Sequence, residues 1–402
     1  MAKAAIMGYG TVGSGVYDII KMNAARLEAA AGEKIELKYI LDIRDFDDHP
    51  EKHLFTKDVK DIINDGEVSV VAEVMGGLHP AYEFTKELLS AGKSVVTSNK
   101  ELVATYGSEL LKIAEENNVN YMFEASVGGG IPIIRPLNRC LAANNITRIA
   151  GILNGTTNYI LYQMITNDKS FDTALRDAQA NGYAERNPAA DIEGHDACRK
   201  IAILSSLAWG KEVDYSSIST EGIVDITLED VRYAAAADAV IKLIGYAERL
   251  DNGKVYAHVA PMMIKHDCML SDIDDVYNGI LVRGDAVGDV MFYGAGAGKL
   301  PTASAVVADM IDSVIHKERR ALIGWEKTDE DVCAAADDKK FRYFMRTQDT
   351  AENVRSVFGG AEILKSLADN ETAFITEELT ASEAAEKSAA LSGMITSIRV
   401  FD

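Results

Sequence analysis

A glycine-rich run directly after a short apolar segment constrains the fold of this chain more than any other feature. The segment Lys3–Met7 is expected to form a strand, and a helical pattern follows the run. The run consists of Gly8, Tyr9, Gly10, Thr11, Val12 and Gly13. In a dinucleotide-binding fingerprint the first glycine permits a tight turn, the second lets a pyrophosphate approach the backbone, and the third allows close helix–strand packing. A structural turn is the alternative, but the position after a strand favours nucleotide binding.

Beyond this run, the first half of the chain alternates strands and helices in the manner of a parallel sheet. Further strands are expected at Lys34–Asp42, Val68–Met75, Ser94–Ser98 and Val119–Ala125, with a helix through Leu110–Glu116. Ligands of such sheets bind beyond the carboxyl ends of the strands. Polar residues and glycines that follow the strands are therefore candidates for the site: Asp42, Arg44, Gly76, Gly77, Asn99, Lys100 and Glu124. Glu73 lies within its strand, and we interpret it as structural.

The end of the second expected strand bears on the choice of cofactor. An acid there would bind the ribose hydroxyls of NAD, whereas a nearby arginine would accommodate the extra phosphate of NADP. The sequence offers both, as Asp42 and Arg44. Arg44 favours NADP and leaves NAD open as the alternative. The alternative without a role in cofactor binding is a surface ion pair between Arg44 and Asp45.

The stretch Gly182–Lys200 places one lysine among several carboxylates. The acids are Glu185, Asp191, Glu193 and Asp196. Asp196 and Lys200 are spaced by one helical turn at the start of a helical pattern, so they share one face. Burial and neighbouring charge can retune such a lysine for proton transfer to a bound polar substrate. Ordinary ion pairs at a solvated helix start are the alternative.

After Gly130 the pattern changes. A helix is expected to begin at Ile131–Ile134, and a strand at Ile149–Leu153 leads into the polar turn Asn154–Asn158. That turn either directs amides and hydroxyls at a carboxylate or simply caps the next helix. Later strands are expected at Ser219–Val224, Val255–Met263 and Gly279–Val282, followed by a glycine-rich turn at Phe292–Gly298 and a helix at Thr302–Ile315 that packs back on the first domain.

Composition and charge exclude several functions. The chain has 402 residues, 48% of them hydrophobic, which is enough for two or three domains with cores. A net charge of −21 leaves no electrostatic footprint for nucleic acid or an anionic membrane. The scattered cysteines Cys140, Cys198, Cys268 and Cys333 lack the spacing of a zinc site or a disulfide scaffold. No signal peptide or membrane-spanning run is recognisable, so we expect a cytoplasmic protein.

Several motifs in a fixed order make the chain resemble homoserine dehydrogenase over about residues 1–325. They are Gly8–Gly13, Thr97–Glu101, Glu124–Pro132, Gly151–Asn158, Gly182–Lys200 and Tyr293–Gly298. The resemblance implies an α/β fold with a Rossmann dinucleotide-binding domain and a second α+β domain for substrate binding and dimerisation. It also implies a reversible, NAD(P)-dependent conversion of L-aspartate 4-semialdehyde to L-homoserine, on the route to threonine, isoleucine and methionine, by a homodimer.

The same resemblance implies a role for each matching residue. Lys200 is the general acid and base at the carbonyl oxygen, and Lys100 lies beside the nicotinamide and the substrate. Glu185 binds the substrate ammonium, Asp191 and Asp196 complete the polar wall, and Thr156 sits in the substrate-side turn. A monovalent cation, usually sodium, is held with a structural role by the backbone carbonyls of Glu124, Val127, Gly129 and Ile131.

Three rival functions are compatible with parts of the sequence. A phosphorylating semialdehyde dehydrogenase needs a nucleophilic cysteine, but Cys198 points away from the helix face that carries Asp196 and Lys200. A nucleotide-sensing module would bind the cofactor without turnover, and the intact Lys100 and Lys200 argue against it. An amino-acid dehydrogenase would release ammonium. His195 is interpreted as a polar residue at a helix start.

The last part of the chain is expected to form a small ACT-like βαβαβ appendage. Its elements are strand Phe341–Arg346, helix Ala351–Leu367, strand Thr372–Leu379, helix Ala381–Leu391 and strand Ile395–Phe401. The usual Pro-Gly-Val-Leu type of turn is replaced by Gln348–Asn353, and the unit lacks one strand, so an amino-acid sensor and a dimer-stabilising appendage are both open. The expected domains are 1–130 with about 296–325, then 131–295, then 337–402.

Overall fold

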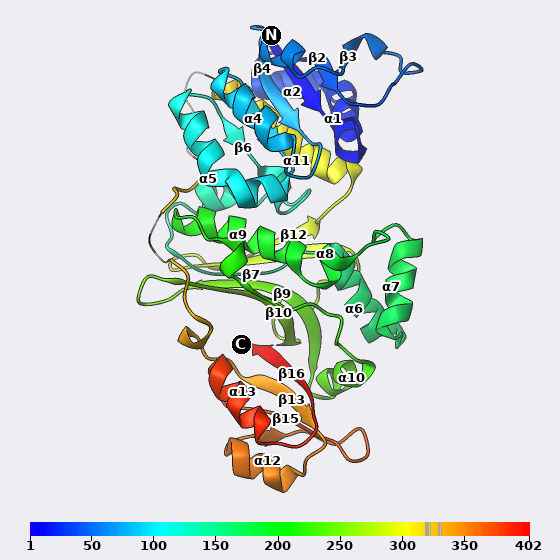
Figure 1. The fold of residues 1–402 in the computed structure, drawn as a ribbon, viewed down its shortest axis with the longest axis vertical. Coiled ribbons are helices and arrows are strands. Elements are labelled where there is room, and N and C mark those ends of the chain that lie inside the picture. The colour runs from blue at the N-terminus through cyan, green and yellow to red at the C-terminus, as the bar shows by residue number, and fades with distance from the viewer. Residues whose placement is uncertain (318–320, 322, 329, 331) are drawn as a thin grey trace. The chain divides into compact units, whose positions relative to one another are not determined.

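A computed structural model describes residues 1–317, 321, 323–328, 330 and 332–402, and the chain divides into two compact units (Figure 1). The first unit comprises Met1–Asn145, Ala202–Asp214 and Gly294–Glu330. The second comprises Ile146–Ile201, Tyr215–Tyr293 and Asp331–Asp402. Each unit is therefore assembled from segments that are far apart in the sequence.

The first unit is built on a six-stranded parallel sheet, as the sequence predicts. In spatial order its strands are β3 (Phe55–Thr56), β2 (Ile35–Leu41), β1 (Ala2–Met7), β4 (Val68–Glu73), β5 (Ser94–Thr97) and β6 (Tyr121–Met122). The order reverses between β1 and β4, which is the switch point where ligands of such sheets bind. The inner strands are buried on both faces, because helices cover the sheet on both sides.

The covering helices follow from the βα alternation (Figure 1). They are α1 (Thr11–Met22), α2 (Ala24–Ala31), α3 (Lys60–Ile63), α4 (Ala81–Ser90), α5 (Lys100–Glu116) and α11 (Lys299–Ile315). A Cβ on Gly15 of α1 would lie 2.9 Å from the Cβ of Ala303 on α11, so this glycine permits the two helices to touch. The prediction that the helix near 302–315 packs on the first unit is confirmed. The strand predicted at Val119–Ala125 is wrong beyond β6, because Glu124–Ser126 forms a 3₁₀ turn.

The second unit is built on a ten-stranded mixed sheet. The path runs β12 (Gly288–Ala295), β11 (Tyr277–Gly284), β7 (Ile146–Ile152), β9 (Ala239–Arg249), β10 (Val255–Lys265), β16 (Met394–Phe401), β13 (Tyr343–Thr347), β15 (Thr372–Ile375) and β14 (Glu362–Ile363), with β8 (Ser219–Thr220) beside β10. Its helices are α6 (Gly155–Asn167), α7 (Phe171–Ala180), α8 (Ala189–Ile192), α9 (His195–Trp209), α10 (Leu228–Ala236), α12 (Ala351–Phe358) and α13 (Ala381–Ala389). The residues of α9 are divided between the two units.

Several local predictions for this part of the chain are wrong. The long strand β9 was not predicted, because it is buried on both faces and shows no polar alternation. The glycine-rich turn predicted at Phe292–Gly298 begins inside β12, and the strand predicted at Ser219–Val224 is limited to β8. The helix expected from Ile131 starts at Ile134 and continues as a π-helix at Pro136–Cys140.

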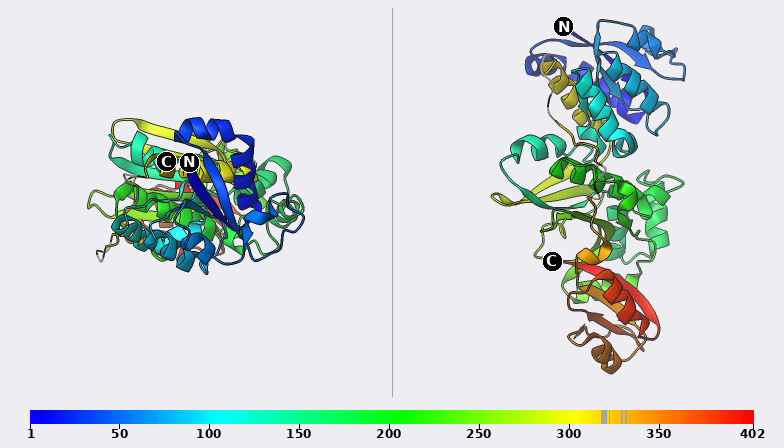
Figure 2. Two further views of the ribbon diagram at one scale, coloured as in Figure 1. Left: turned by 90° about the horizontal axis from the view of Figure 1, so that it is seen from above. Right: turned by 60° about the vertical axis from the view of Figure 1, so that its left-hand side comes forward.

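The C-terminal segment has the order β13, α12, β14, β15, α13, β16. The helix predicted at Ala351–Leu367 is therefore wrong, since α12 ends at Phe358 and β14 supplies the strand that the expected βαβαβ order lacked. Strand β16 pairs in parallel with β10, and Figure 2 shows it, in red, beside the green strands of the middle of the chain. The appendage thus continues the sheet of the second unit.

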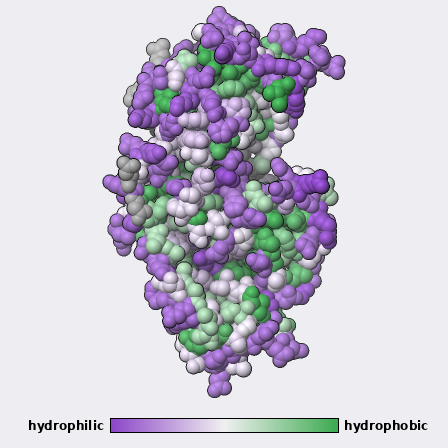
Figure 3. Space-filling model, in the orientation of Figure 1, coloured by the Kyte–Doolittle hydropathy of each residue, from purple (hydrophilic) through white to green (hydrophobic). Residues whose placement is uncertain are grey.

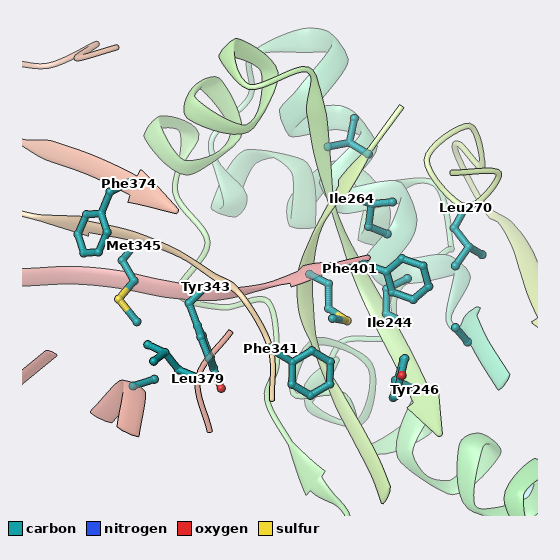
Figure 4. Packing of buried hydrophobic residues seen from close by; sticks show 14 of the residues in the cluster. Ile244, Tyr246, Ile264, Leu270, Phe341, Tyr343, Met345, Phe374, Leu379 and Phe401 are labelled. Carbon is teal, nitrogen blue, oxygen red and sulfur yellow. The ribbon is translucent and has the colours of Figure 1, made fainter. Parts of the chain in front are cut away.

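One apolar core joins this segment to the strands before it (Figure 4). The buried residues labelled there are Ile244, Tyr246, Ile264, Leu270, Phe341, Tyr343, Met345, Phe374, Leu379 and Phe401. The surface is different, since hydrophilic residues predominate on the face shown in Figure 3, as a chain with 62 acidic and 41 basic residues requires. Among the described residues, no helix combines the length and the apolar composition that a bilayer crossing needs.

Candidate active site

In the glycine-rich loop between β1 and α1, packing and backbone conformation require glycine at two positions but not at a third. Gly8 has a φ of +95°, and a Cβ on Gly13 would lie 1.9 Å from the carbonyl oxygen of Gly8, so both are required by the fold. A Cβ on Gly10 would meet no heavy atom of the described residues within 4 Å. Packing of the described residues therefore does not require glycine at position 10, and binding of a dinucleotide pyrophosphate at the N-terminus of α1 stays a prediction.

Asp42 and Arg44 form one ion-paired unit beside this loop. The Asp42 carboxylate accepts from the backbone N–H of Tyr9 at 2.7 Å and from Nε and Nη2 of Arg44, both at 2.9 Å. Arg44 also donates to the carbonyl oxygen of Tyr9 at 2.9 Å. The guanidinium holds the pKa of Asp42 well below its usual range. The alternative pairing of Arg44 with Asp45 is wrong, because Asp45 pairs with Lys57 at 2.6 Å.

A cavity of 260 Å³ opens at the carboxyl ends of β2 and β3. Its lining mixes three acids with three cations: Asp42, Asp45, Asp47, Arg44, Lys52 and Lys57. The Arg44 guanidinium is 56% exposed and lies over the ring of Phe46 at 5.2 Å. A cavity with charged and aromatic side chains at the carboxyl ends of these strands lies where the adenosine end of a dinucleotide binds in sheets of this kind.

Glu73 is fully buried at the end of β4 and joins two loops at the switch point. Its carboxylate accepts from the Thr97 hydroxyl at 2.6 Å and from the Met75 N–H at 2.9 Å. Burial raises the pKa of this carboxyl group. Thr97 in turn accepts from the N–H of Asn99 at 2.9 Å, and Asn99 caps α5, which starts at Lys100. The contacts support the structural interpretation of Glu73 and fix the backbone at Lys100.

The loop expected to hold a cation is a buried, crowded turn. The Glu124 side chain accepts from the backbone N–H groups of Ile133 and Ile134, at 2.6 and 2.7 Å, so it caps the following helical segment. Val127 and Ile131 are almost fully buried. A Cβ on Gly129 would lie 2.2 Å from the carbonyl oxygen of Gly296, which brings a further carbonyl close to this turn. The Glu124 carboxylate is therefore engaged within the chain, and a cation bound by the backbone carbonyls of this turn stays a prediction.

In the second unit, Lys200 and two of the predicted acids converge on the end of β7. The ammonium nitrogen of Lys200 lies 2.8 Å from Oδ2 of Asp196 and donates to the carbonyl oxygen of Leu153 at 2.7 Å. Asn154 donates through Nδ2 to Asp191 at 2.7 Å and to Oδ2 of Asp196 at 2.9 Å. Asp196 and Lys200 are 3% and 7% exposed, so their charges are largely removed from water. An ordinary solvated ion pair at a helix start is excluded by this burial.

Two other predicted substrate residues lie in or against the loop before α8. The hydroxyl of Thr156 donates to the carbonyl oxygen of Tyr183 at 2.7 Å, which fixes the loop on the first turn of α6. Glu185 is exposed, and its carbonyl oxygen accepts from Gln179 at 3.1 Å. Lys100 belongs to the first unit, where it is the first residue of α5.

The neighbours of Lys200 on α9 have other roles. Cys198 donates to the carbonyl oxygen of Tyr215 at 3.3 Å, a different partner from that of Lys200. This supports the prediction that the thiol lies on another face of the helix. His195 is exposed and lies 3.2 Å from the Glu193 carboxylate, which agrees with a polar helix-start residue.

Sequence reasoning missed the contribution of Leu153 and Asn154 to this cluster. Both follow β7, and each supplies a backbone or amide group to residues about forty positions later. The signal available was the polar turn after an apolar strand, which predicts either a helix cap or amides directed at a carboxylate but names no distant partner.

Two family models match the chain, and together they cover most of it. The model described as the homoserine dehydrogenase NAD binding domain matches residues 8–124, and the homoserine dehydrogenase model matches residues 132–311. The chain belongs to the homoserine dehydrogenase family. Members of this family are NAD(P)-dependent oxidoreductases that interconvert L-aspartate 4-semialdehyde and L-homoserine, and the chain is such an enzyme.

Curated relatives and solved structures agree with this assignment. Homoserine dehydrogenase from Bacillus subtilis is 42% identical over 326 residues, which cover 80% of this chain and 75% of the relative. Homoserine dehydrogenase from Synechocystis is 42% identical over 318 residues, covering 78% of this chain and 73% of the relative. The crystal structure of a homoserine dehydrogenase from Thiobacillus denitrificans superposes with a TM-score of 0.90 at 34% identity, covering 100% of this chain and 98% of that one. A mutant hyperthermophilic archaeal homoserine dehydrogenase in complex with NADPH has a TM-score of 0.66 at 28% identity, covering 78% and 98%.

Proposed function

We propose that Lys200 is the proton donor and acceptor of this dehydrogenase and that NADP is its preferred cofactor. The observation that carries the proposal is the placement of the Lys200 ammonium, buried between the Asp196 carboxylate and the Leu153 carbonyl. Reduction of an aldehyde delivers a hydride to carbon while the oxygen takes up a proton. The bound cofactor supplies the hydride, and the protein supplies position and charge.

Lys200 suits the proton-transfer role for two reasons. Its positive charge stabilises the alkoxide that develops on the substrate oxygen, and its N–H then protonates that oxygen. In the oxidation direction the neutral amine accepts the proton of the homoserine hydroxyl. In the resting enzyme Asp196 and the Leu153 carbonyl oxygen hold the ammonium in place.

Substrate binding is assigned to the residues around this cluster. The Glu185 carboxylate binds the substrate ammonium, and Asp191 and Asp196 complete an acidic wall that matches its charge. Thr156 shapes the substrate-side turn. Lys100 contacts the nicotinamide and the substrate. These assignments follow the family motifs and the convergence of Asp191, Asp196 and Lys200 on the end of β7.

Arg44 is assigned to the 2′-phosphate of NADP. Arg44 lines the cavity next to the glycine-rich loop and its side chain is more than half exposed, so its guanidinium can exchange the carboxylate for a phosphate. An NADPH complex of a related archaeal enzyme agrees with this choice. NAD remains a substrate in this proposal, with Asp42 free to bind its ribose hydroxyls when Arg44 is displaced.

Three further features complete the proposal. A sodium-like ion bound by the carbonyls of Glu124, Val127, Gly129 and Ile131 has a structural role. The enzyme is a cytoplasmic homodimer through the second domain, as is usual in the family. The segment 337–402 stabilises the dimer or senses an amino acid, and a titration with threonine during turnover separates the two, since inhibition at about millimolar concentration is expected only of a sensor.

The test is homoserine-dependent reduction of NADP⁺ and of NAD⁺ by the purified protein, with the semialdehyde identified as product. We expect turnover with both cofactors, a lower KM for NADP⁺, and no release of ammonium. Binding of NADP⁺ without turnover of homoserine or of the semialdehyde would support the nucleotide-sensing alternative and contradict the proposal.

A further inference from the structure

Asn154 occupies the junction between the substrate-side turn and the Lys200 cluster. It is 6% exposed and precedes α6, whose first turn it caps, because Oδ1 accepts from the Thr157 N–H at 2.9 Å. Its Nδ2 group donates to Asp191 at 2.7 Å and to Asp196 at 2.9 Å. The amide orientation follows from these partners, since the oxygen faces a donor and the nitrogen faces two acceptors.

The turn that carries Asn154 is held in place by hydrogen bonds to the segment 273–277. Asn158, one helical turn later, donates to the carbonyl oxygens of Ile273, Asp275 and Tyr277, at 3.0 to 3.1 Å. The fully buried Lys242 donates to Asn158 at 3.3 Å and to the Ile273 carbonyl at 2.6 Å. A Cβ on Gly155 would lie 2.6 Å from the carbonyl oxygen of Val276. The backbone at Asn154 therefore has little freedom to shift.

We infer that Asn154 is a positioning residue that holds Asp191 and Asp196 together and so fixes the carboxylate that faces Lys200. The inference rests on the proposed function of Lys200. Two carboxylates that approach one site repel each other, and with Asp196 buried and Asp191 half-buried this repulsion favours uptake of a proton. A neutral amide that donates to both keeps them close without adding a second cation that would compete for the substrate ammonium.

The charge balance of the cluster depends on this neutrality. Asp196 pairs with Lys200 on the same helix α9, Asp191 of α8 shares the Asn154 amide with Asp196, and Glu185 lies in the loop before α8. An aspartate at position 154 would preserve shape and helix cap but add a third carboxylate. The proton on Lys200 would then be held more tightly, and homoserine oxidation, which needs the neutral amine, would require a higher pH.

Two variants and one control test the inference. Asn154→Asp keeps the cap and replaces the donors by an acceptor, and Asn154→Ser keeps a capping oxygen but has one donor in place of two. Ser170 caps α7, because its side chain accepts from the Thr173 N–H. Ser170→Ala is the control, since it removes a helix cap that lies outside the Lys200 cluster. Each protein is assayed for kcat/KM of homoserine oxidation across pH, for NADP⁺ binding and for thermal unfolding.

We expect Asn154→Asp to lower kcat/KM by about 10²-fold and to move the rising limb of the pH–rate profile upward by about one pH unit. Asn154→Ser should lower kcat/KM by about tenfold, while both variants bind NADP⁺ as the wild type does. Ser170→Ala should leave both kcat/KM and the position of the rising limb of the pH–rate profile unchanged. If both Asn154 variants are folded and keep the wild-type limb, Asn154 is only a helix cap and the inference is wrong.

Lys200→Ala in the same panel separates this inference from the function on which it rests. An active Lys200→Ala protein overturns the acid–base role itself. An inactive Lys200→Ala protein, beside Asn154 variants that behave as the wild type, overturns only the role of Asn154.

Discussion

Two buried ion pairs in the second unit look alike in geometry and differ in what they can do. Lys200 lies 2.8 Å from Asp196, with side chains 9% and 3% exposed. Arg346 of β13 lies 2.7 Å from Asp230 of α10, with side chains 3% and 0% exposed. By distance and burial alone, both would qualify as candidate reactive centres.

The chemistry of the cations separates them. A guanidinium stays charged at any pH the protein experiences, whereas an ammonium can release its proton. Arg346 also donates to Thr227 at 3.1 Å and to Glu371 at 2.8 Å, so it binds α10 to the C-terminal segment. Burial and pairing therefore mark a strong electrostatic site, and the ability to exchange a proton marks a catalytic one.

The largest effect that sharpens this comparison is expected for Lys200→Ala. Loss of a general acid and base lowers the rate by about 10²–10⁴-fold. We expect kcat/KM for homoserine, measured per folded molecule, to fall within that range while NADP⁺ binding measured by fluorescence stays unchanged. A rate within about threefold of the wild type would break the contrast between the two pairs.

For Arg346→Ala the effect should lie in stability. Removing one partner of a buried pair leaves an uncompensated charge and costs about 3–5 kcal/mol. We expect the free energy of unfolding in urea to fall by that amount, with kcat per folded molecule near the wild-type value. Arg346→Lys restores the charge without the planar fork and should recover part of the loss. A large fall in kcat of folded Arg346→Ala would assign this cluster a role in turnover.

The pair Asp42–Arg44, in which only the Arg44 side chain is exposed, provides a third, weaker case. Charge-assisted hydrogen bonds contribute about 1.5–3 kcal/mol, so Arg44→Ala should raise the KM for NADP⁺ by about tenfold or more. The KM for NAD⁺ should change by less than about twofold. Asp45→Asn removes the neighbouring pair with Lys57 and serves as the control. Equal changes for the two cofactors would contradict recognition of the 2′-phosphate by Arg44.

The smallest effect is expected for Glu73→Gln, where a buried acid is held by neutral donors. Burial raises the pKa of Glu73 above its unfolded value of about 4.3. Its stabilising contribution is then complete below that unfolded pKa and is lost as the pH rises through the folded pKa. The free energy of unfolding in urea is measured for both proteins at about pH 5 and about pH 8. Between the lower and the higher pH, the wild type should lose more of this free energy than Glu73→Gln does. If the wild type instead gains stability relative to Glu73→Gln as the pH rises, the pKa of Glu73 is not raised.

Local features of the site could be predicted from the sequence, and long-range ones could not. The glycine-rich loop and the Asp196–Lys200 face depend on residues within about one helical turn, so spacing alone predicts them. The bonds of Asn154 span 37 and 42 residues, and their partners depend on how β7 and α8 meet. In the fold, β9 was missed because both of its faces are buried, and β14 because it has only two residues.

The most direct test of the account replaces Lys200 by arginine. Lys200→Arg keeps a positive charge on the face that Asp196 occupies but cannot give up a proton at accessible pH. We predict a folded protein that binds NADP⁺ and oxidises homoserine no faster than Lys200→Ala. Turnover within about tenfold of the wild type would show that charge alone suffices, and would contradict the claim that Lys200 carries the proton.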